Sequence, residues 1–337
     1  MTAERRPPSI HAARAWKDGV VVTTGVDPLK LREYMDQPGE LVWIDLVNPA
    51  ESDLSAILTR AGLPQNAVED LLGPLERPKI VQHEDWTYFT VYATRHNSEH
   101  EFGQAGVPLT RQRISAVVNG TTLLTVRLDD TFDMSLVVQR WDEGADVKAH
   151  GMAALVHGLL DVVVDGHFDT IQQLDDVAES LEDELFNDKP PNQQFIRKVY
   201  SLRKELSELR RVIVPMREIM QGLQRRTRSQ DPDMEAWWID LNDHVLRAIE
   251  WTESVRDMAS SLIETDMSMQ DWRLNTDMKK LAGWAGVIAV PTLITGWFGQ
   301  NVEFPGNGEW TGLLISTLII VGSSLALYLQ FKRRDWL

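Results

Sequence analysis

The sequence contains no cysteine, so disulfide bonds, thiolate metal ligands and cysteine nucleophiles are all excluded. It also lacks a glycine-rich phosphate loop, a serine nucleophile elbow and the His-Glu-x-x-His motif of zinc proteases. Its eight histidines are scattered and form no convincing cluster with metal-ligand spacing. We therefore expect a protein that is not an enzyme and that carries no organic cofactor.

Basic residues are few relative to acidic ones. The chain has 34 lysines and arginines against 50 aspartates and glutamates, which gives a formal net charge of −16. This surplus argues against general nucleic-acid binding, because the phosphate backbone is itself negative. It is compatible with a protein that gathers cations.

Charge is absent from two long runs near the end of the chain. Residues 281–298 and 311–331 contain no charged side chain. Each run is close to the ~20 residues that a helix needs to cross about 30 Å of hydrocarbon. The alternative is a buried helical hairpin in a soluble core, but two adjacent uncharged runs of this length are rare there. We expect two transmembrane helices, at 281–300 and 311–331.

The charges that flank these runs predict their orientation. Lysines 279–280 precede the first run and the basic residues 332–334 follow the second. The connecting segment, 299–310, contains Glu303 and Glu309 but no lysine or arginine. By the positive-inside rule, both chain ends are expected in the cytoplasm and the loop outside a plasma membrane, with lipid around the two helices. The two loop carboxylates would attract cations to the outer side.

The first 150 residues predict a mixed α/β head. Residues 41–46 and 86–95 have the composition of buried strands, and 113–127 that of a hairpin. Asn119-Gly120 supplies the positive φ angles of the tight turn. Residues 52–62 predict a helix with a serine cap and a terminal glycine.

The following residues predict long helices. Apolar residues recur three and four apart over 152–186, and a second helix is expected from about 193 to 228, bent at Pro215. From Met234 the helical pattern continues into the first apolar run, as one helix of about 65 residues or ~100 Å. The expected domain order is head (1–150), cytoplasmic helical stalk or funnel (151–280), two transmembrane helices around an outer loop at 301–310 (281–331), and basic cytoplasmic tail (332–337).

The first apolar run has features of a pore lining. Two helices cannot enclose an aqueous path alone, so transport would require a homo-oligomer. Small residues recur three and four apart along one face: Ala282, Ala285, Ala289, Thr292, Gly296 and Gly299. Such a stripe more often marks close helix packing than a pore. Asn301 favours the pore, because a ring of amide oxygens suits hydrated Mg²⁺, which gives up its water reluctantly.

The run PTLITGWFGQN, followed by an acidic loop, a second apolar run and a basic tail, resembles the CorA family of divalent-cation channels, the group with two transmembrane helices and a Gly-x-Asn motif. The resemblance extends over essentially the whole chain. It implies an α+β cytoplasmic head, long stalk helices and a funnel-shaped homopentamer whose first transmembrane helices line the pore. It also implies entry of Mg²⁺ driven by the membrane potential, with Co²⁺ and Ni²⁺ as further ions.

The same resemblance assigns roles to residues along the first apolar run. Asn301 matches the selectivity asparagine of the motif, and Gly299 the glycine at which the backbone turns. Thr292 matches a polar ring deeper in the pore. Leu281 matches the hydrophobic constriction, and Asn275 a polar ring at the cytoplasmic entrance.

A regulatory Mg²⁺ site is also implied by the resemblance. Asp240 falls where the family binds an ion between subunits, and the partner carboxylate is expected from the head of the next subunit, at Asp85 or Glu84. Bound Mg²⁺ would hold the closed state, and its loss would let like charges repel. Without the resemblance, Asp240 is an ordinary solvated helix residue.

Gln300 departs from the usual methionine of the motif, which puts the ion preference in doubt. ZntB proteins, a related branch associated with Zn²⁺ uptake coupled to protons, also vary this position, so a ZntB-like transporter is the first alternative. The apolar runs contain no Asp, Glu or His that could relay protons. A scaffold or sensor with two membrane anchors is the second alternative, although an anchor has no use for Gly299 and Asn301.

Overall fold

The computed structural model describes residues 10–25, 39–63, 65–73, 77–97, 109–144, 147–187, 191–300, 306 and 308–336. These residues fall into two compact units, Met1–Leu262 and Ile263–Leu337, and the boundary lies inside one long helix. The strands are β1 (Ile10–Lys17), β2 (Val20–Thr23), β3 (Glu40–Val47), β4 (Lys79–Gln82), β5 (Thr87–His96), β6 (Leu109–Val118) and β7 (Thr122–Arg127). The helices of the first unit are α2 (Glu51–Arg60), α3 (Ala67–Leu72), α4 (Ser135–Glu143), α5 (Val147–Phe186), α6 (Gln193–Ile213), α7 (Met216–Gln230), the short 3₁₀ helix η2 (Pro232–Met234) and the start of α8 (Glu235–Phe298).

The first unit is built on a seven-stranded sheet with the strand order β2-β1-β3-β7-β6-β5-β4. Only β3 and β7 pair in parallel; the other neighbours are antiparallel. The strands predicted at 41–46 and 86–95 are confirmed as β3 and β5, and the predicted hairpin as β6–β7. The positive φ angles predicted for Asn119 and Gly120 were wrong, because neither residue has one. Instead, the Asn119 side chain accepts hydrogen bonds from the backbone N–H groups of Thr121 (3.0 Å) and Thr122 (2.7 Å), which holds the turn closed.

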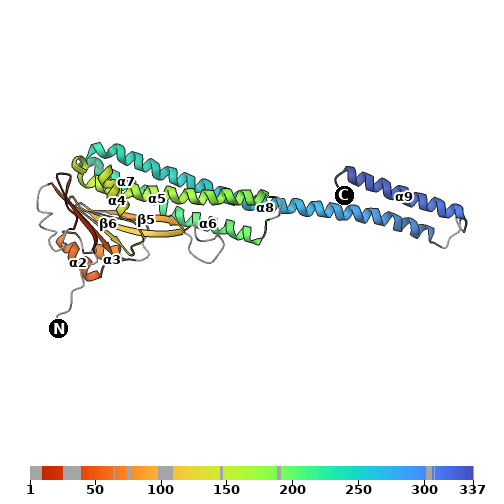
Figure 1. The fold of residues 1–337 in the computed structure, drawn as a ribbon, viewed down its shortest axis with the longest axis horizontal. Helices are drawn as coiled ribbons and strands as arrows, with labels where there is room; N and C mark the ends of the chain where they lie inside the picture. Colours follow the sequence, from red (N-terminus) through yellow and green to blue (C-terminus); the bar gives the residue numbers. More distant parts are fainter. Residues whose placement is uncertain are drawn as a thin grey trace, which may run out of the picture. The chain divides into compact units, whose positions relative to one another are not determined.

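Successive side chains along a strand point to opposite faces of the sheet, so the buried core is divided into two clusters, one on each face. In β3, Trp43 belongs to one buried cluster while Val42 and Ile44 belong to the other. Helices α2 and α3 cover one face, and α4, α5 and α7 cover the other, as Figure 1 shows. The predicted α+β head with long helices is therefore confirmed.

Two details of the predicted helices differ from the structure. Helix α2 begins at Glu51 after Ala50, so Ser52 lies inside the helix and the predicted serine cap was wrong. The predicted glycine at the end of the helix is confirmed. Gly62 has φ +66°, and its N–H and that of Leu63 donate to the carbonyls of Thr59 and Leu58, which closes the helix in a Schellman motif. The second difference is at Pro215, where α6 ends and α7 begins, because proline cannot donate the next helical hydrogen bond.

Helix α5 is one of three helices that are long and apolar enough to cross a membrane, together with Pro232–Phe298 and α9 (Trp310–Arg333). Its most apolar window is 61% buried inside the protein, whereas the corresponding windows of the other two are each 6% buried. Helix α5 packs on β5, and buried residues such as Leu155, Leu159 and Val163 face the sheet. Its apolar character is therefore explained by the core of the head.

His167 lies at the centre of the contact between α5 and β5. It is fully buried, and its Nε2 lies 2.8 Å from the backbone carbonyl of Tyr92. Its Nδ1 has no hydrogen-bond partner among the described residues. Burial lowers the pKa of His167 from 6.5 to about 4, and the bond to Tyr92 offsets only part of this effect. The ring is therefore neutral in the folded head at neutral pH.

This lowered pKa predicts an acid-sensitive head. The unfolded chain takes up the His167 proton near pH 6.5 and the folded chain only near pH 4, so stability is fully present above pH 6.5 and falls between these values. Protonation of His167 should lower the free energy of unfolding by about 3 kcal/mol, at ~1.36 kcal/mol per pKa unit. We expect chemical denaturation of residues 1–262 at pH 7.5 and at pH 4.5 to show this difference in the free energy of unfolding. The His167→Gln variant should show a smaller difference between the two pH values.

The exposed His11 provides the matched control for this experiment. His11→Gln should leave the pH dependence as in the unsubstituted head. An equally steep dependence in the His167→Gln protein would show that other groups cause the acid sensitivity.

Helix α8 is continuous from Glu235 to Phe298, as predicted. Along its first half, buried residues alternate three and four apart: Trp238, Leu241, Val245, Ala248, Thr252, Val255, Ala259 and Leu262. This seam packs α8 into the first unit. Pro291 lies within the last turns of the helix without ending it.

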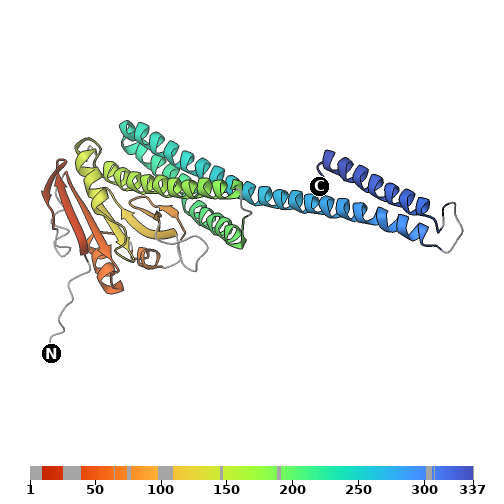
Figure 2. The ribbon, with the colours of Figure 1, turned by 45° about the vertical axis from the view of Figure 1, so that its right-hand side comes forward.

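The second unit contains the rest of α8 and helix α9. Figure 2 shows the two helices side by side. Gly286 permits the close approach, because a Cβ there would lie 3.3 Å from the Phe331 ring. Trp284 and Tyr328 also face each other, with ring centroids 6.4 Å apart.

Candidate functional site

The apolar parts of α8 and α9 have almost no protein around them in a single chain. Large side chains on both helices are exposed, among them Leu281, Trp297 and Leu318. An apolar surface of this length needs lipid or further protein chains to cover it. These two helices are therefore the elements on which an ion path can be built.

Three of the predicted pore residues share one line along α8. Leu281, Thr292 and Gly299 are spaced by 11 and 7 residues, which places them within about 20° of one another around an α-helix. Leu281 is 73% exposed, and the Thr292 hydroxyl donates to the Ile288 carbonyl (2.9 Å). The Thr292 oxygen therefore keeps its ability to accept hydrogen bonds from a hydrated cation. Asn275 lies about 120° away from Leu281 around the helix, on another face.

The Gly-x-Asn segment follows the end of α8. The Gly299 N–H donates to the Thr295 carbonyl (2.9 Å) and that of Gln300 to Trp297 (3.3 Å), so both continue the last helical turn. Asn301 and Glu303 lie outside the described residues. Glu309 caps the start of α9 without a side-chain cap bond, and its carboxylate accepts from the Thr311 hydroxyl (3.1 Å).

The predicted regulatory residue Asp240 lies in the first unit, on the exposed side of α8. Its side chain is 71% exposed, and the His244 ring one turn later is 4.0 Å from its carboxylate. Across the contact with α5, His157 Nε2 lies 3.2 Å from the Trp237 carbonyl. Asp240 thus stands in a group of ionisable side chains from two helices.

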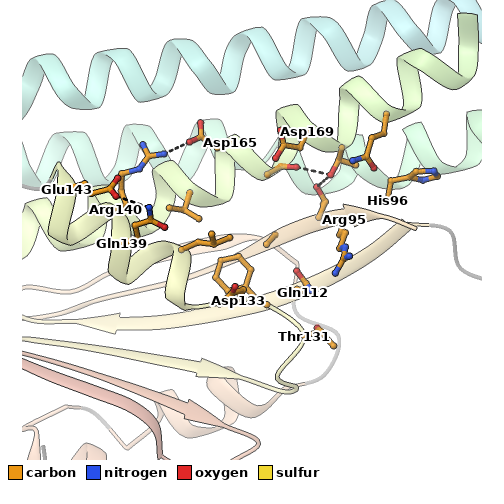
Figure 3. A pocket seen from close by; sticks show the side chains of 18 residues that line it. Arg95, His96, Gln112, Thr131, Asp133, Gln139, Arg140, Glu143, Asp165 and Asp169 are labelled. Atoms are coloured by element: carbon orange, nitrogen blue, oxygen red, sulfur yellow. Dashed lines mark hydrogen bonds and ion pairs between the residues drawn. The ribbon is translucent and has the colours of Figure 1, made fainter. Parts of the chain in front are cut away.

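Arg140 of α4 also belongs to this group, although its role was not predicted from the sequence. Its guanidinium binds Asp161 and Asp165, which lie one turn apart on α5, and the contact to Asp165 is 2.6 Å. Figure 3 shows Arg140 and Asp165 at the edge of a cavity of about 540 Å³ between α4, α5 and the sheet. The i, i+4 spacing of the two aspartates was visible in the sequence, but their basic partner lies on another helix.

Burial and mutual charge shift the pKa values of two of these groups. Burial raises the pKa of Asp161, and the charge of Arg140 offsets part of this increase. Burial lowers the pKa of His157, against the attraction of Asp161 and Asp240. Both shifts favour the uncharged forms.

The expected partners of Asp240 lie on another element of the chain. Glu84 and Asp85 lie in the exposed turn between β4 and β5. Arg226 of α7 holds this turn by donating to the backbone carbonyls of His83 (2.6 Å) and Glu84 (3.1 Å). Among the described residues, neither carboxylate bonds to Asp240, and no three acidic or histidine side chains are grouped so as to hold a metal ion. A metal at Asp240 would therefore need ligands from elsewhere.

Known proteins match this chain over almost its whole length. It is 25% identical over 303 residues to the cobalt/magnesium transport protein CorA of Thermotoga maritima, covering 88% of this chain and 83% of the relative. The fold resembles the complete CorA magnesium transporter of Methanocaldococcus jannaschii, with a TM-score of 0.72, 20% identity and coverage of 96% and 98%. It also resembles the cytoplasmic domain of ZntB from Vibrio parahaemolyticus, with a TM-score of 0.57, 14% identity and coverage of 77% and 98%.

The family model described as CorA-like Mg²⁺ transporter protein matches residues 38–333. This range includes most of the head, all of α8 and all of α9. The match confirms the resemblance stated from the Gly-x-Asn segment and the two apolar runs. The chain belongs to the family of CorA-like Mg²⁺ transporter proteins.

Proposed function

We propose that the protein carries Mg²⁺ into the cytoplasm across the plasma membrane, with Co²⁺ and Ni²⁺ as further substrates. The observation that supports this most strongly is the family match over residues 38–333, which includes both helices with exposed apolar surfaces. Relatives of similar length are cobalt and magnesium transport proteins. No organic cofactor takes part.

The proposed assembly is a homopentamer with two membrane-spanning helices per subunit. The ends of the apolar runs carry the basic residues, so both chain ends are assigned to the cytoplasm and the loop between α8 and α9 to the outside. In this proposal the head ends at residue 150, the stalk at residue 280 and the membrane segment at residue 331, where the tail begins. The described part of one chain offers only two long apolar helices with exposed surfaces, which cannot enclose a path by themselves, so several copies are needed.

The proposed ion path follows α8. Hydrated Mg²⁺ meets the Gly299-Gln300-Asn301 ring at the outer mouth, drawn there by Glu303 and Glu309. It then passes the rings of Thr292 and Leu281. Asn275 lies on another face of α8, and the resemblance alone assigns it to a ring at the cytoplasmic entrance. Neutral oxygen acceptors hold a hydrated ion through its water molecules and release it again, whereas a ring of carboxylates would bind it too tightly to conduct.

The membrane potential is sufficient to drive this entry. Moving two charges through 100 mV releases about 4.6 kcal/mol, at ~2.3 kcal/mol per charge. This corresponds to a concentration ratio of roughly 10³ at equilibrium. The proposed transport therefore needs no nucleotide hydrolysis.

The second candidate is Zn²⁺ uptake coupled to protons, which Gln300 favours because it replaces the usual methionine of the motif. Two observations weigh against it. The apolar runs carry no acidic or histidine side chain to relay a proton, and the segment at the mouth offers no His or Cys, the ligands that Zn²⁺ prefers.

Uptake into proteoliposomes tests the function. The purified chain is reconstituted, and Mg²⁺ entry is followed with an internal Mg²⁺-sensitive dye under an imposed potential or an imposed pH gradient. We expect entry that follows the potential and ignores the pH gradient. Zn²⁺ entry that requires the proton gradient would favour the second candidate. The absence of any divalent flux from folded, inserted protein would favour a membrane-anchored scaffold.

We further propose that cytoplasmic Mg²⁺ closes the path by binding between Asp240 of one subunit and Asp85 or Glu84 of the next. The exposed position of Asp240, and the absence of a complete metal site within the described chain, support a site shared between copies. Asp240→Asn should raise Mg²⁺ uptake at high Mg²⁺ on the head side by about fivefold or more, within the usual range of allosteric coupling.

Asp257→Asn is the control for this variant, because it removes another exposed carboxylate from α8. Uptake by the control should stay inhibited by Mg²⁺ as in the unsubstituted protein. If Asp240→Asn is inhibited equally, the regulatory role of Asp240 is wrong.

A further inference from the structure

The turn between β4 and β5 carries Glu84 and Asp85, the two carboxylates proposed above to share Mg²⁺ with Asp240 of a neighbouring subunit. Both side chains are exposed, and among the described residues neither carboxylate takes part in an ion pair or a hydrogen bond. Their oxygens are therefore available, and carboxylate oxygen is a ligand that Mg²⁺ prefers. Ordering a mobile turn at the moment of binding costs conformational entropy, so a turn that is already ordered binds the ion more tightly.

The backbone of this turn does not close on itself in the usual way. In a four-residue turn, the carbonyl of the first residue commonly accepts from the N–H of the fourth. Here the His83 N–H donates to the Trp86 carbonyl (2.9 Å), but no backbone N–H among the described residues donates to the carbonyl of His83 or of Glu84. These two carbonyl oxygens of the turn are therefore left to other donors.

Arg226 of α7 supplies these donors. Its Nη1 donates to the carbonyls of His83 (2.6 Å) and Trp86 (3.3 Å), and its Nη2 donates to the carbonyl of Glu84 (3.1 Å). The guanidinium is planar and holds its donors in a fixed fork, so the three bonds restrain the turn as one unit. The rings of His83 and Trp86 stack with centroids 4.0 Å apart, which joins the two ends of the turn. All three bonds are made to the backbone, so they leave the carboxylates of the turn available to bind an ion.

Arg226 lies on a helix that is itself attached to β4. The Gln82 side chain donates to the Gly222 carbonyl (2.7 Å), one helical turn before Arg226. A Cβ on Gly222 would lie 2.8 Å from Ile80 Cδ1, so glycine allows α7 to lie close against the strand. These contacts fix the distance between α7 and the strand that leads into the turn.

The guanidinium acts on a cation at this turn in two opposite ways. Its positive charge repels Mg²⁺, which weakens binding at the neighbouring carboxylates. Its hydrogen bonds order the turn, which strengthens binding. The bonds to His83 and Glu84 lie at an exposed site, where salt and water screen the charge, whereas the bonds act directly on the backbone that carries the carboxylates. We therefore expect the ordering of the turn to be the larger effect.

We propose that Arg226 is a positioning residue for the regulatory Mg²⁺ site, because it holds the β4–β5 turn in the conformation in which Glu84 and Asp85 bind the ion. Arg226 itself does not touch the ion. It adds to the site a side chain that is 140 residues away from Trp86 in the sequence. The inference rests on the proposed regulation by Mg²⁺ between subunits, since the turn has this role only if its carboxylates bind Mg²⁺.

Calorimetric titration of the full chain in detergent with Mg²⁺ tests the proposal without ion flux. The binding heat that disappears in Asp240→Asn identifies the regulatory site. Arg226→Lys keeps the positive charge but loses the fork of donors, and we expect it to weaken this binding about fivefold. Arg226→Gln, which also removes the charge, should weaken it as well. Hydrogen exchange should become faster at the amides of residues 83–86 in both variants, and the melting temperature without Mg²⁺ verifies that the head is folded.

Arg225→Lys is the matched control, because Arg225 is the exposed neighbour of Arg226 on α7, and its Mg²⁺ affinity should be unchanged. If Arg226→Lys does not fold, Gln82→Ala loosens the turn from α7 and should weaken binding in the same direction. Unchanged affinity in the folded Arg226→Lys protein, or tighter binding by Arg226→Gln, would overturn the positioning role. Equal binding by Asp240→Asn and the unsubstituted chain would instead show that the regulatory site itself is wrong, and the inference would fail with it.

Discussion

Replacing Asn301 with alanine is expected to reduce Mg²⁺ uptake into proteoliposomes to the level of liposomes without protein. In the proposed homopentamer the substitution removes every amide oxygen of one ring at the outer mouth. Hydrated Mg²⁺ exchanges its inner water slowly and needs acceptors for the hydrogen atoms of those waters. Without the ring, the ion loses the contacts that offset the cost of leaving bulk solvent.

The matched control is Asn307→Ala, which removes an amide from the same connecting segment but outside the Gly-x-Asn motif. It should retain most of the uptake. Gel filtration of each variant before reconstitution establishes that the assembly is intact. Uptake by Asn301→Ala at half the unsubstituted rate or more would show that Asn301 does not form the selective ring. A scaffold without transport would show no uptake in any of the three proteins.

The parts of the structure that were predictable are those determined by local pattern. No glycine or proline occurs between Met234 and Gly283, and apolar residues recur three and four apart, so the long helix α8 was expected. Asn119-Gly120 between two apolar strands likewise predicted the β6–β7 hairpin. In both cases neighbouring residues in the sequence determine the conformation.

The parts that were missed depend on contacts between distant residues. Arg140 meets Asp161 and Asp165 only because α4 packs beside α5. His150 at the start of α5 likewise meets Asp231 (2.7 Å) only because α5 packs beside η2. Pairing of side chains across elements leaves no periodic signal in one sequence, so neither feature was visible before the fold.

The buried ion pair between Asp45 and Arg127 is another contact of this kind. The two residues lie on the neighbouring parallel strands β3 and β7, and they are 0% and 1% exposed. Arg127 Nη2 lies 2.6 Å from Asp45 Oδ2, and the Thr125 hydroxyl donates to Asp45 Oδ1 (2.7 Å). Burial alone would lower the pKa of Arg127, but the hydrogen bonds and charge of Asp45 outweigh it and raise the pKa. Arg127 is therefore charged in the folded head.

The remaining Arg127 donors are also used. Nη1 donates to the Phe132 carbonyl (2.8 Å) and to Asp130 (3.1 Å). Arg127 thus ties the segment after β7 to the end of β3. A substitution here changes both the charge balance of the core and the position of the chain that leads to α4.

Arg127→Met should destabilise the head by about 3–5 kcal/mol, because it leaves the Asp45 carboxylate buried without its cation. Urea denaturation of residues 1–262, followed by the fluorescence of buried tryptophans such as Trp43, measures the change. Lys198→Met, which breaks the half-exposed pair with Glu184 (2.9 Å), should cost less than about 1 kcal/mol. The double variant Asp45→Leu/Arg127→Met should recover much of the loss, because it removes both charges together. A double variant less stable than Arg127→Met would show that hydrogen bonds to Thr125 and Phe132, and not charge compensation, dominate this part of the core.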